Sequence, residues 1–259
     1  MNIVNSFSGR YSLSQELSKK VKDLFNKEDV EIIPFGFEII SNNSENLKAF
    51  INSPESNQSH SAMLVKFAPD FILFKKKQPQ EIYFLEIKVS VTPLWSSKNF
   101  NEIILKHPNT KLSDIGLIAR EAWNAYNTLF PNTIILSATS YNPNILKAQL
   151  VSNIKCLRCN GKNGQEDCSK CPIKQHGFFE HSRNYNAIGS QTQHTNLDLS
   201  SFLDANVFFK SIGLDLNNNV FQDIIQMFKT QGITFPPMCN TSTKTKIIDK
   251  LKNEGCDWL

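Results

Sequence analysis

The stretch that decides the fold runs from Leu64 to Val91 and reads LVKFAPDFILFKKKQPQEIYFLEIKVSV. Two of its segments, Leu64–Phe74 and Glu81–Val91, are rich in Val, Ile, Phe and Tyr, which is typical of β-strands. Between them lies the polar sequence KKKQPQ, whose proline and charged residues indicate a turn. The sequence therefore predicts a β-hairpin.

Three charged residues of this hairpin have an informative spacing. Asp70 is separated from Glu86 by fifteen residues, and Lys88 follows Glu86 two positions later. Because side chains alternate between the two faces of a strand, Glu86 and Lys88 share one face, and the apolar residues beside them fill the other. A hairpin centred near Gln78 places Asp70 across from Glu86, with Cβ atoms about 4.5–5.5 Å apart.

These residue types match the needs of phosphodiester hydrolysis. Two carboxylates at that separation can hold one Mg²⁺ ion, which prefers hard oxygen ligands and keeps several water molecules. The ion neutralises the phosphate, acidifies a bound water and orients it for in-line attack. A lysine beside the ion can polarise or deprotonate that water. Asp70, Glu86 and Lys88 are therefore candidate catalytic residues, and Asp70 and Glu86 are candidate Mg²⁺ ligands.

A solvated strand face is the alternative explanation for this Glu-x-Lys pattern. It predicts polar flanks, whereas Ile82-Tyr83-Phe84-Leu85 and Val89-Ser90-Val91 are largely apolar. A charged pair inside a mostly apolar strand lowers stability unless it has a function or a partner. The flanks therefore favour a functional site.

Outward from the hairpin, hydrophobic periodicity predicts a mixture of helices and strands. Leu13, Leu17, Val21 and Leu24 recur at helical spacing ahead of the hairpin. The other expected elements are a short strand within Glu31–Ile40, a loop with one helical turn at Ser41–Ser61, a helix at Asp114–Phe130 and a buried strand at Thr133–Ser140. This mixture predicts an α/β fold with a mixed central sheet.

The order of these elements, with Pro69-Asp70 and Glu86-Ile87-Lys88 on the hairpin, resembles the PD-(D/E)XK superfamily of restriction-endonuclease-like nucleases. The resemblance covers about residues 12–140 and implies a restriction-endonuclease-like core flanked by helices. It also implies that Asp70 and Glu86 bind Mg²⁺ and that Lys88 activates the water. In many members an acidic residue of the first helix approaches the metal, which makes Glu16 a further catalytic candidate and Glu38 its alternative.

A cluster of cysteines predicts a second metal site. Two C-x2-C pairs, separated by eight residues, are formed by Cys156, Cys159, Cys168 and Cys171. Four thiolates complete a tetrahedral, structural Zn²⁺ site, for which His176 or His181 is an alternative to one cysteine. An iron–sulfur cluster is the competing interpretation, because Pro172 follows the last cysteine.

The composition suggests three parts along the chain. Residues 1–150 are expected to form the nuclease core and residues 151–195 a zinc-binding insertion, because the cysteines and many polar residues gather there. Helical periodicity returns afterwards, so residues 196–259 are expected to form a helical C-terminal region. The longest apolar runs fall short of the ~20 residues of a membrane span, and the N-terminus lacks the pattern of a secretory signal, which predicts a cytoplasmic protein.

The predicted function is Mg²⁺-dependent cleavage of double-stranded DNA by an endonuclease, of the type II restriction class. The formal net charge of +4 is compatible with a nucleic-acid partner. The resemblance also makes a homodimer an expected assembly. Two alternatives stay open: a structure-specific repair, recombination or mobile-element nuclease, and a non-enzymatic zinc-containing protein that binds nucleic acid.

Overall fold

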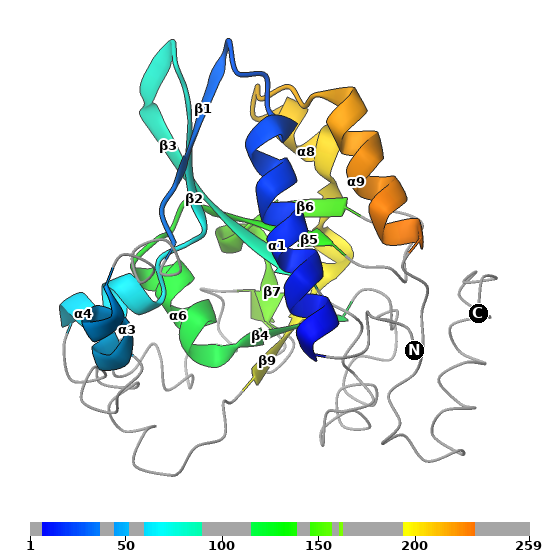
Figure 1. Ribbon diagram of the computed structural model, residues 1–259. Helices are drawn as coiled ribbons and strands as arrows, with labels where there is room; N and C mark the ends of the chain where they lie inside the picture. The colour runs from blue at the N-terminus through cyan, green and yellow to red at the C-terminus, as the bar shows by residue number, and fades with distance from the viewer. Residues whose placement is uncertain are drawn as a thin grey trace, which may run out of the picture.

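The main sheet has six strands and mixed direction. The computed structural model describes residues 7–36, 44–51, 60–89, 115–138, 146–156, 161–162 and 194–230. The strands follow the order β1 (Val30–Pro34), β2 (Phe71–Lys75), β3 (Gln78–Val89), β5 (Thr133–Ala138), β6 (Leu146–Leu150) and β10 (Leu203–Asp204). Only β3 and β5 pair in parallel within this sheet; the other neighbours are antiparallel. The mixed α/β class agrees with the sequence-based expectation (Figure 1).

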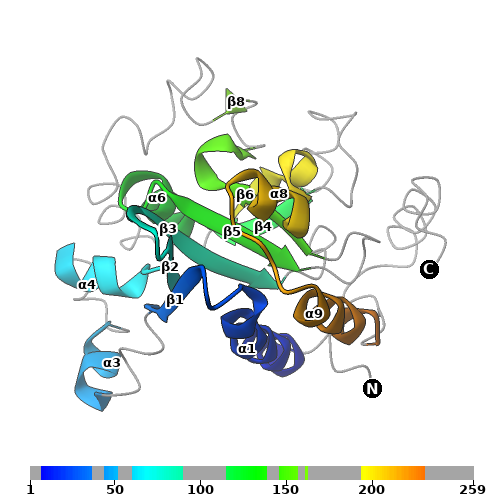
Figure 2. The same cartoon turned by 90° about the horizontal axis from the view of Figure 1, so that it is seen from above.

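Helices cover both faces of this sheet. One face packs against α1 (Phe7–Leu24), α8 (Ala205–Ser211) and α9 (Asn218–Thr230), and the buried residues include Leu17, Leu85, Ile87, Phe209 and Phe228. The other face packs against α6 (Arg120–Thr128) through a second cluster that includes Trp123, Tyr126, Phe130 and Ile135. Figure 2 shows α1 and α9 on one side of the strands and α6 on the other. The two faces of β3 therefore meet different helices.

A second, antiparallel sheet lies beside α6. Its strands follow the order β4 (Ile115–Ala119), β9 (His194–Asp198), β7 (Lys155–Cys156) and β8 (Gly161–Lys162). Leu197 of β9 joins the cluster that contains Trp123 and Ile135, so one apolar layer links the second sheet, α6 and the main sheet. Within the described parts of the chain, no helix has the length and apolar character needed to cross a membrane.

The segment ahead of the hairpin is more helical than expected. Residues 45–51 form α3 (Glu45–Ile51), for which Ser44 Oγ accepts a hydrogen bond from the Leu47 backbone N at 3.2 Å, as an N-cap residue does. A second short helix, α4 (His60–Lys66), includes Leu64 and Val65, which were expected in a strand. A short apolar run does not by itself distinguish a strand from a buried helix.

The expected helix at Asp114–Phe130 is wrong in its first third. Residues Ile115–Ala119 form β4, which pairs with β9 from far along the chain, and the helix begins only at Arg120. Tertiary pairing of this kind overrides local propensity, because strand formation depends on neighbours that a local pattern does not reveal. The buried strand expected at Thr133–Ser140 is confirmed as β5, all of whose residues are buried.

The described part of the C-terminal region belongs to the same core as the N-terminal half. The helix expected around Phe221, Ile224 and Phe228 is confirmed as α9, and these three residues are buried against the main sheet. The strand β10 pairs with β6, a strand that the sequence pattern did not indicate. The expected boundary at residue 150 therefore crosses a continuous sheet and a shared core.

Candidate active site

Asp70 and Glu86 meet at the open end of the β2–β3 hairpin. Phe71 pairs with Leu85, so Asp70, the residue before β2, stands at the position that faces Glu86. The pairing of β2 with β3 is centred on the residue expected from the sequence. A bulge at Phe74 and Lys75 moves the turn to Lys76–Lys77. Asp70 Oδ2 accepts a hydrogen bond from the Ile87 backbone N at 2.7 Å. This bond fixes the Asp70 carboxylate against β3.

Glu86 is a buried carboxylate with two side-chain partners. Only 5% of its surface is exposed. Lys88 Nζ donates a hydrogen bond to Glu86 Oε1 and forms an ion pair with it. The hydroxyl of Tyr126, on α6, lies within hydrogen-bonding reach of the same carboxylate. A buried carboxylate is costly unless it is paired and hydrogen-bonded, and these two partners offset that cost.

Lys88 keeps its proton in this arrangement. Burial disfavours the ammonium and lowers the pKa, but the nearby carboxylates of Glu86 and Asp70 and the hydrogen bond to Glu86 outweigh burial, so the pKa of Lys88 is raised above its ordinary value. Its side chain is still 35% exposed, so solvent weakens these effects. Lys88 therefore acts here as a cation and a hydrogen-bond donor, and only a change in the charge around Glu86 would make it a base.

Tyr126 is a site residue that the sequence pattern did not single out. It is 3% exposed, and burial raises its pKa well above the ordinary value, with further contributions from the charge of Glu86, the hydrogen bond to Glu86 and the charge of Asp70. The phenol therefore stays neutral and donates. Tyr126 follows Ala122 by four residues, which places it on the buried stripe of α6. The sequence could have indicated it as an aromatic residue on this stripe whose hydroxyl group needs a hydrogen-bond partner.

Several sequence-predicted site residues do not meet this cluster. Glu16 is exposed on α1, the helix that packs against the Leu85 and Ile87 face of β3, whereas Glu86 points to the opposite face. The structure therefore does not bring Glu16 to the carboxylates. Its alternative, Glu38, and three of the cysteines, Cys159, Cys168 and Cys171, lie outside the described residues, as do His176 and His181.

Cys156 is described only through its backbone. It ends β7 and pairs with Gly161 of β8, so residues 157–160, which include Cys159, connect two antiparallel strands.

The donor set near Glu86 suits a cation that needs few protein ligands. Among the residues that the structure describes, no group of three or more His, Cys, Asp or Glu side chains converges. Asp70 and Glu86 supply two carboxylates, and Mg²⁺ is commonly held by one or two carboxylates with waters and substrate phosphates. Both carboxylates also accept hydrogen bonds from the protein, which limits how they turn toward an ion.

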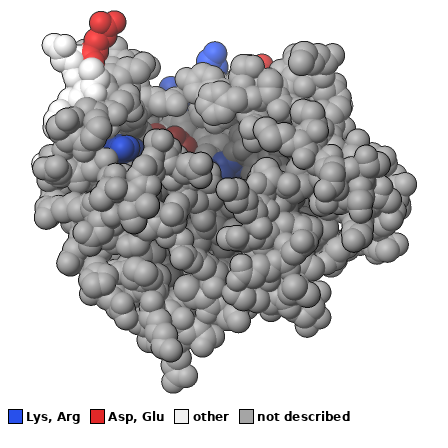
Figure 3. Space-filling view, turned by 90° about the horizontal axis from the view of Figure 1, so that it is seen from below, with Lys and Arg blue, Asp and Glu red and all other residues white. Residues whose placement is uncertain are grey.

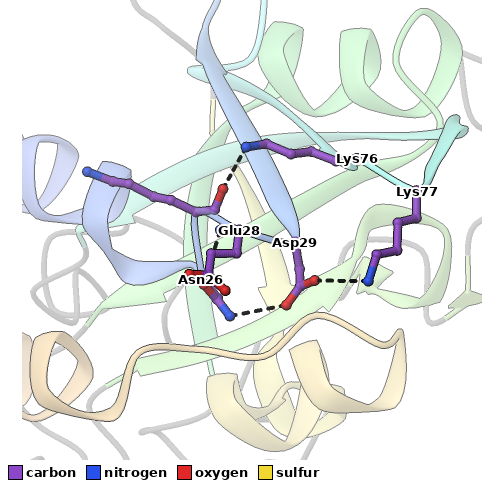
Figure 4. Close-up of polar contacts among 6 residues, drawn as sticks. Asn26, Glu28, Asp29, Lys76 and Lys77 are labelled. Carbon is purple, nitrogen blue, oxygen red and sulfur yellow. Dashed lines mark hydrogen bonds and ion pairs between the residues drawn. The ribbon is translucent and has the colours of Figure 1, made fainter.

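The lysine run of the hairpin turn lies at the other end of the strands. Lys76 Nζ donates to the Lys27 carbonyl oxygen at 2.6 Å, and Lys77 Nζ lies 3.7 Å from Asp29 Oδ1 (Figure 4). Lys75 Nζ lies 3.6 Å from Glu81 Oε2. The length of β2, at about 3.3 Å per residue, separates these lysines from Asp70 by roughly 17 Å. Lys76 and Lys77 fasten the turn to the segment after α1, and none of the three lysines is part of the carboxylate site.

The neighbourhood of Asp70 is closely packed on one side. The backbone N atoms of Phe35 and Gly36 donate to the Asp70 carbonyl oxygen at 2.9 and 3.1 Å. A Cβ atom on Gly36 would lie 3.1 Å from Asp70 Cα, so glycine permits this close approach. The chain after β1 therefore holds the backbone of Asp70 while β3 holds its carboxylate.

Comparison of the chain with protein-family models, curated proteins and solved structures gives no match.

Proposed function

We propose that this chain is a Mg²⁺-dependent DNA endonuclease of the PD-(D/E)XK type, of the kind found among type II restriction enzymes. The observation that carries the proposal is the convergence of Asp70, Glu86 and Lys88 at one end of the β2–β3 hairpin. A buried carboxylate such as that of Glu86 is costly without a function or a partner. Their residue types are those that phosphodiester hydrolysis requires, a cation site and a polarising ammonium.

Each residue has a definable part in this reaction. Asp70 and Glu86 would hold the ion, which when bound supplies charge neutralisation of the phosphate and acidification of water. Lys88 holds a proton at Nζ beside Glu86 and can donate it in a hydrogen bond to a phosphate oxygen or to the attacking water. Tyr126 orients the Glu86 carboxylate through its hydroxyl. The hydrogen bond from Ile87 N does the same for Asp70.

Cleavage of plasmid DNA tests the proposal. Purified protein should nick or linearise supercoiled plasmid in Mg²⁺, and EDTA should abolish the reaction. Discrete fragments from a long DNA would identify sequence-specific cutting, as a type II restriction enzyme produces. Cutting confined to branched or flapped substrates would identify a repair or recombination nuclease instead. DNA binding with no cleavage of any substrate would refute the enzymatic proposal.

We further propose that Cys156, Cys159, Cys168 and Cys171 bind one structural Zn²⁺ ion. Two C-x2-C pairs supply four thiolates, and Cys156 of the first pair ends β7, where its backbone pairs with Gly161 of β8. Metal analysis of the purified protein should give one zinc per chain, and Cys159→Ser should lower that ratio. Iron with visible absorption would instead identify a cluster, and a metal-free protein would contradict both interpretations.

A further inference from the structure

A row of polar residues extends from Lys88 across the main sheet. In the parallel ladder Lys88 pairs with Ser137 of β5, and in the next, antiparallel ladder Ser137 pairs with Lys147 of β6. Paired residues of neighbouring strands point to the same face of a sheet. Lys88, Ser137 and Lys147 therefore stand side by side across three strands, on the face that carries Glu86.

This row differs from the strand residues around it. On the opposite face, Leu136, Ala138, Leu146 and Ala148 are buried in the core. The row also lies near the carboxyl ends of the parallel strands β3 and β5, the edge outside which ligands bind in open α/β sheets. The row therefore places three polar residues in register at that edge.

The residues of the row differ in exposure. Lys88 is partly exposed and Lys147 is half-buried, while Ser137 lies between them with only 5% of its surface exposed. On the far side of Lys147, Asp204 pairs with it across β10. The Asp204 carboxylate accepts hydrogen bonds from the backbone N atoms of Asn206 and Val207 at the start of α8.

Described charged residues lie on the face toward which this edge of the sheet points. In Figure 1, β3 descends from the hairpin turn, so its carboxyl end is nearer the side from which Figure 3 is drawn. Figure 3 shows acidic and basic atoms of described residues near one another on that face. Both charge types that a metal ion and a phosphate backbone would meet therefore occur on this side of the molecule.

We propose that Ser137 and Lys147 form a phosphate-binding subsite for the DNA backbone next to the scissile phosphate. The proposal rests on the nuclease function, because the row begins at Lys88. Neighbouring strands are about 4.7–4.9 Å apart, so the two lysines are separated by roughly 10 Å at the level of the sheet. Lysine supplies charge and serine a hydroxyl donor, the groups that position a nucleic-acid backbone without reading its sequence.

The salt dependence of DNA binding tests this subsite. Binding of a short DNA duplex is measured in Ca²⁺ at several salt concentrations. Lys147→Gln should weaken binding several-fold and reduce the slope of log K against log salt by about 0.9, the loss of one phosphate contact. Lys147→Arg should keep both the affinity and the slope. Ser137→Ala should weaken binding less and leave the slope unchanged.

Lys229→Gln is the matched control, because Lys229 is an exposed lysine of α9, on the other side of the sheet. It removes the same charge and should leave the slope unchanged. If Lys147→Gln does not fold, Lys147→Met keeps the aliphatic stem and carries the same expectation.

Three outcomes would overturn the subsite. The first is a wild-type slope in the Lys147 variant while the wild-type protein binds and cuts DNA, which leaves the nuclease proposal intact. The second is an equal loss of salt slope in the Lys147 and Lys229 variants, which would show that the loss follows from the net charge of the protein alone. The third is a wild-type protein that neither binds nor cuts DNA, which overturns the nuclease proposal as well.

Discussion

The two ends of the β2–β3 hairpin both carry charged residues, but these residues differ in how far they are buried. At the turn, the side chains of Lys77 and Asp29 are 88% and 57% exposed and form a loose ion pair. At the open end, Glu86 is buried and is held by Lys88 and Tyr126, while Asp70 is bonded to the backbone of β3. The turn has the higher density of charge, whereas the open end has the buried carboxylate of Glu86.

This difference shows that burial, more than the number of charges, marks the functional end. An exposed ion pair contributes about 0–1 kcal/mol and is easily gained or lost. Removing one partner of a buried pair costs more, because the remaining charge stays in a poorly solvated place. A run of lysines therefore reveals little about function, whereas a buried carboxylate with two dedicated donors points to a site.

The largest expected effect comes from the open end. Asp70→Asn, Glu86→Gln and Lys88→Gln should each lower the Mg²⁺-dependent cleavage rate by at least about 100-fold, because each removes a charge that the reaction uses. Asparagine at position 70 can still accept the hydrogen bond from Ile87 N, so the fold should persist. Cleavage is measured under single-turnover conditions.

Circular dichroism and DNA binding in Ca²⁺ serve as controls for these three variants. Wild-type cleavage by any two of them would show that the site is assigned to the wrong residues.

A smaller effect is expected at Tyr126. Tyr126→Phe keeps the ring in the apolar cluster but removes the hydroxyl that donates to Glu86. A hydrogen bond to a charged group contributes about 1.5–3 kcal/mol, so we expect roughly a tenfold slower reaction and a higher Mg²⁺ concentration for half-maximal rate. Tyr83→Phe, on the opposite face of β3, is the control and should leave both quantities unchanged. Identical Mg²⁺ titrations for the wild type and Tyr126→Phe would remove Tyr126 from the site.

The smallest effect is expected at the turn. Lys76→Gln and Lys77→Gln should change the free energy of unfolding by less than about 1 kcal/mol, because the contacts that they remove are exposed. Cleavage and the salt slope of DNA binding should stay at the wild-type values. Denaturant unfolding and the binding assay check this. A reduced salt slope would mean that the turn contacts DNA. It would contradict the conclusion that only the open end of the hairpin is functional.

The hairpin and its register could be predicted from the sequence because they depend on neighbours in the chain. The alternation around Glu86 and Lys88 and the central position of the lysine run together place Asp70 opposite Glu86. The helices α1 and α9 were also predictable, because each buries a stripe at helical spacing.

The elements that the sequence did not reveal depend on partners far away in the chain. Strands β4 and β10 are short and become strands by pairing with β9 and β6. Tyr126 reaches Glu86 only because α6 packs on that face of the sheet. Glu16 was expected near the carboxylates, but the same helix periodicity that buries Leu17 against the other face leaves Glu16 exposed.

The parallel pairing of β3 with β5 has a consequence for when the protein could become active during folding. The β2–β3 hairpin needs only local contacts and can form early, whereas β5 joins β3 after the long connection from Val89 to Thr133 has closed. Asp70 and Glu86 can therefore approach each other before Tyr126, Ser137 and Lys147 are in place. A partly folded chain would hold the acidic pair without the tyrosine that orients Glu86 and without the proposed phosphate contacts, so the complete site would form only as the non-local half of the sheet assembles.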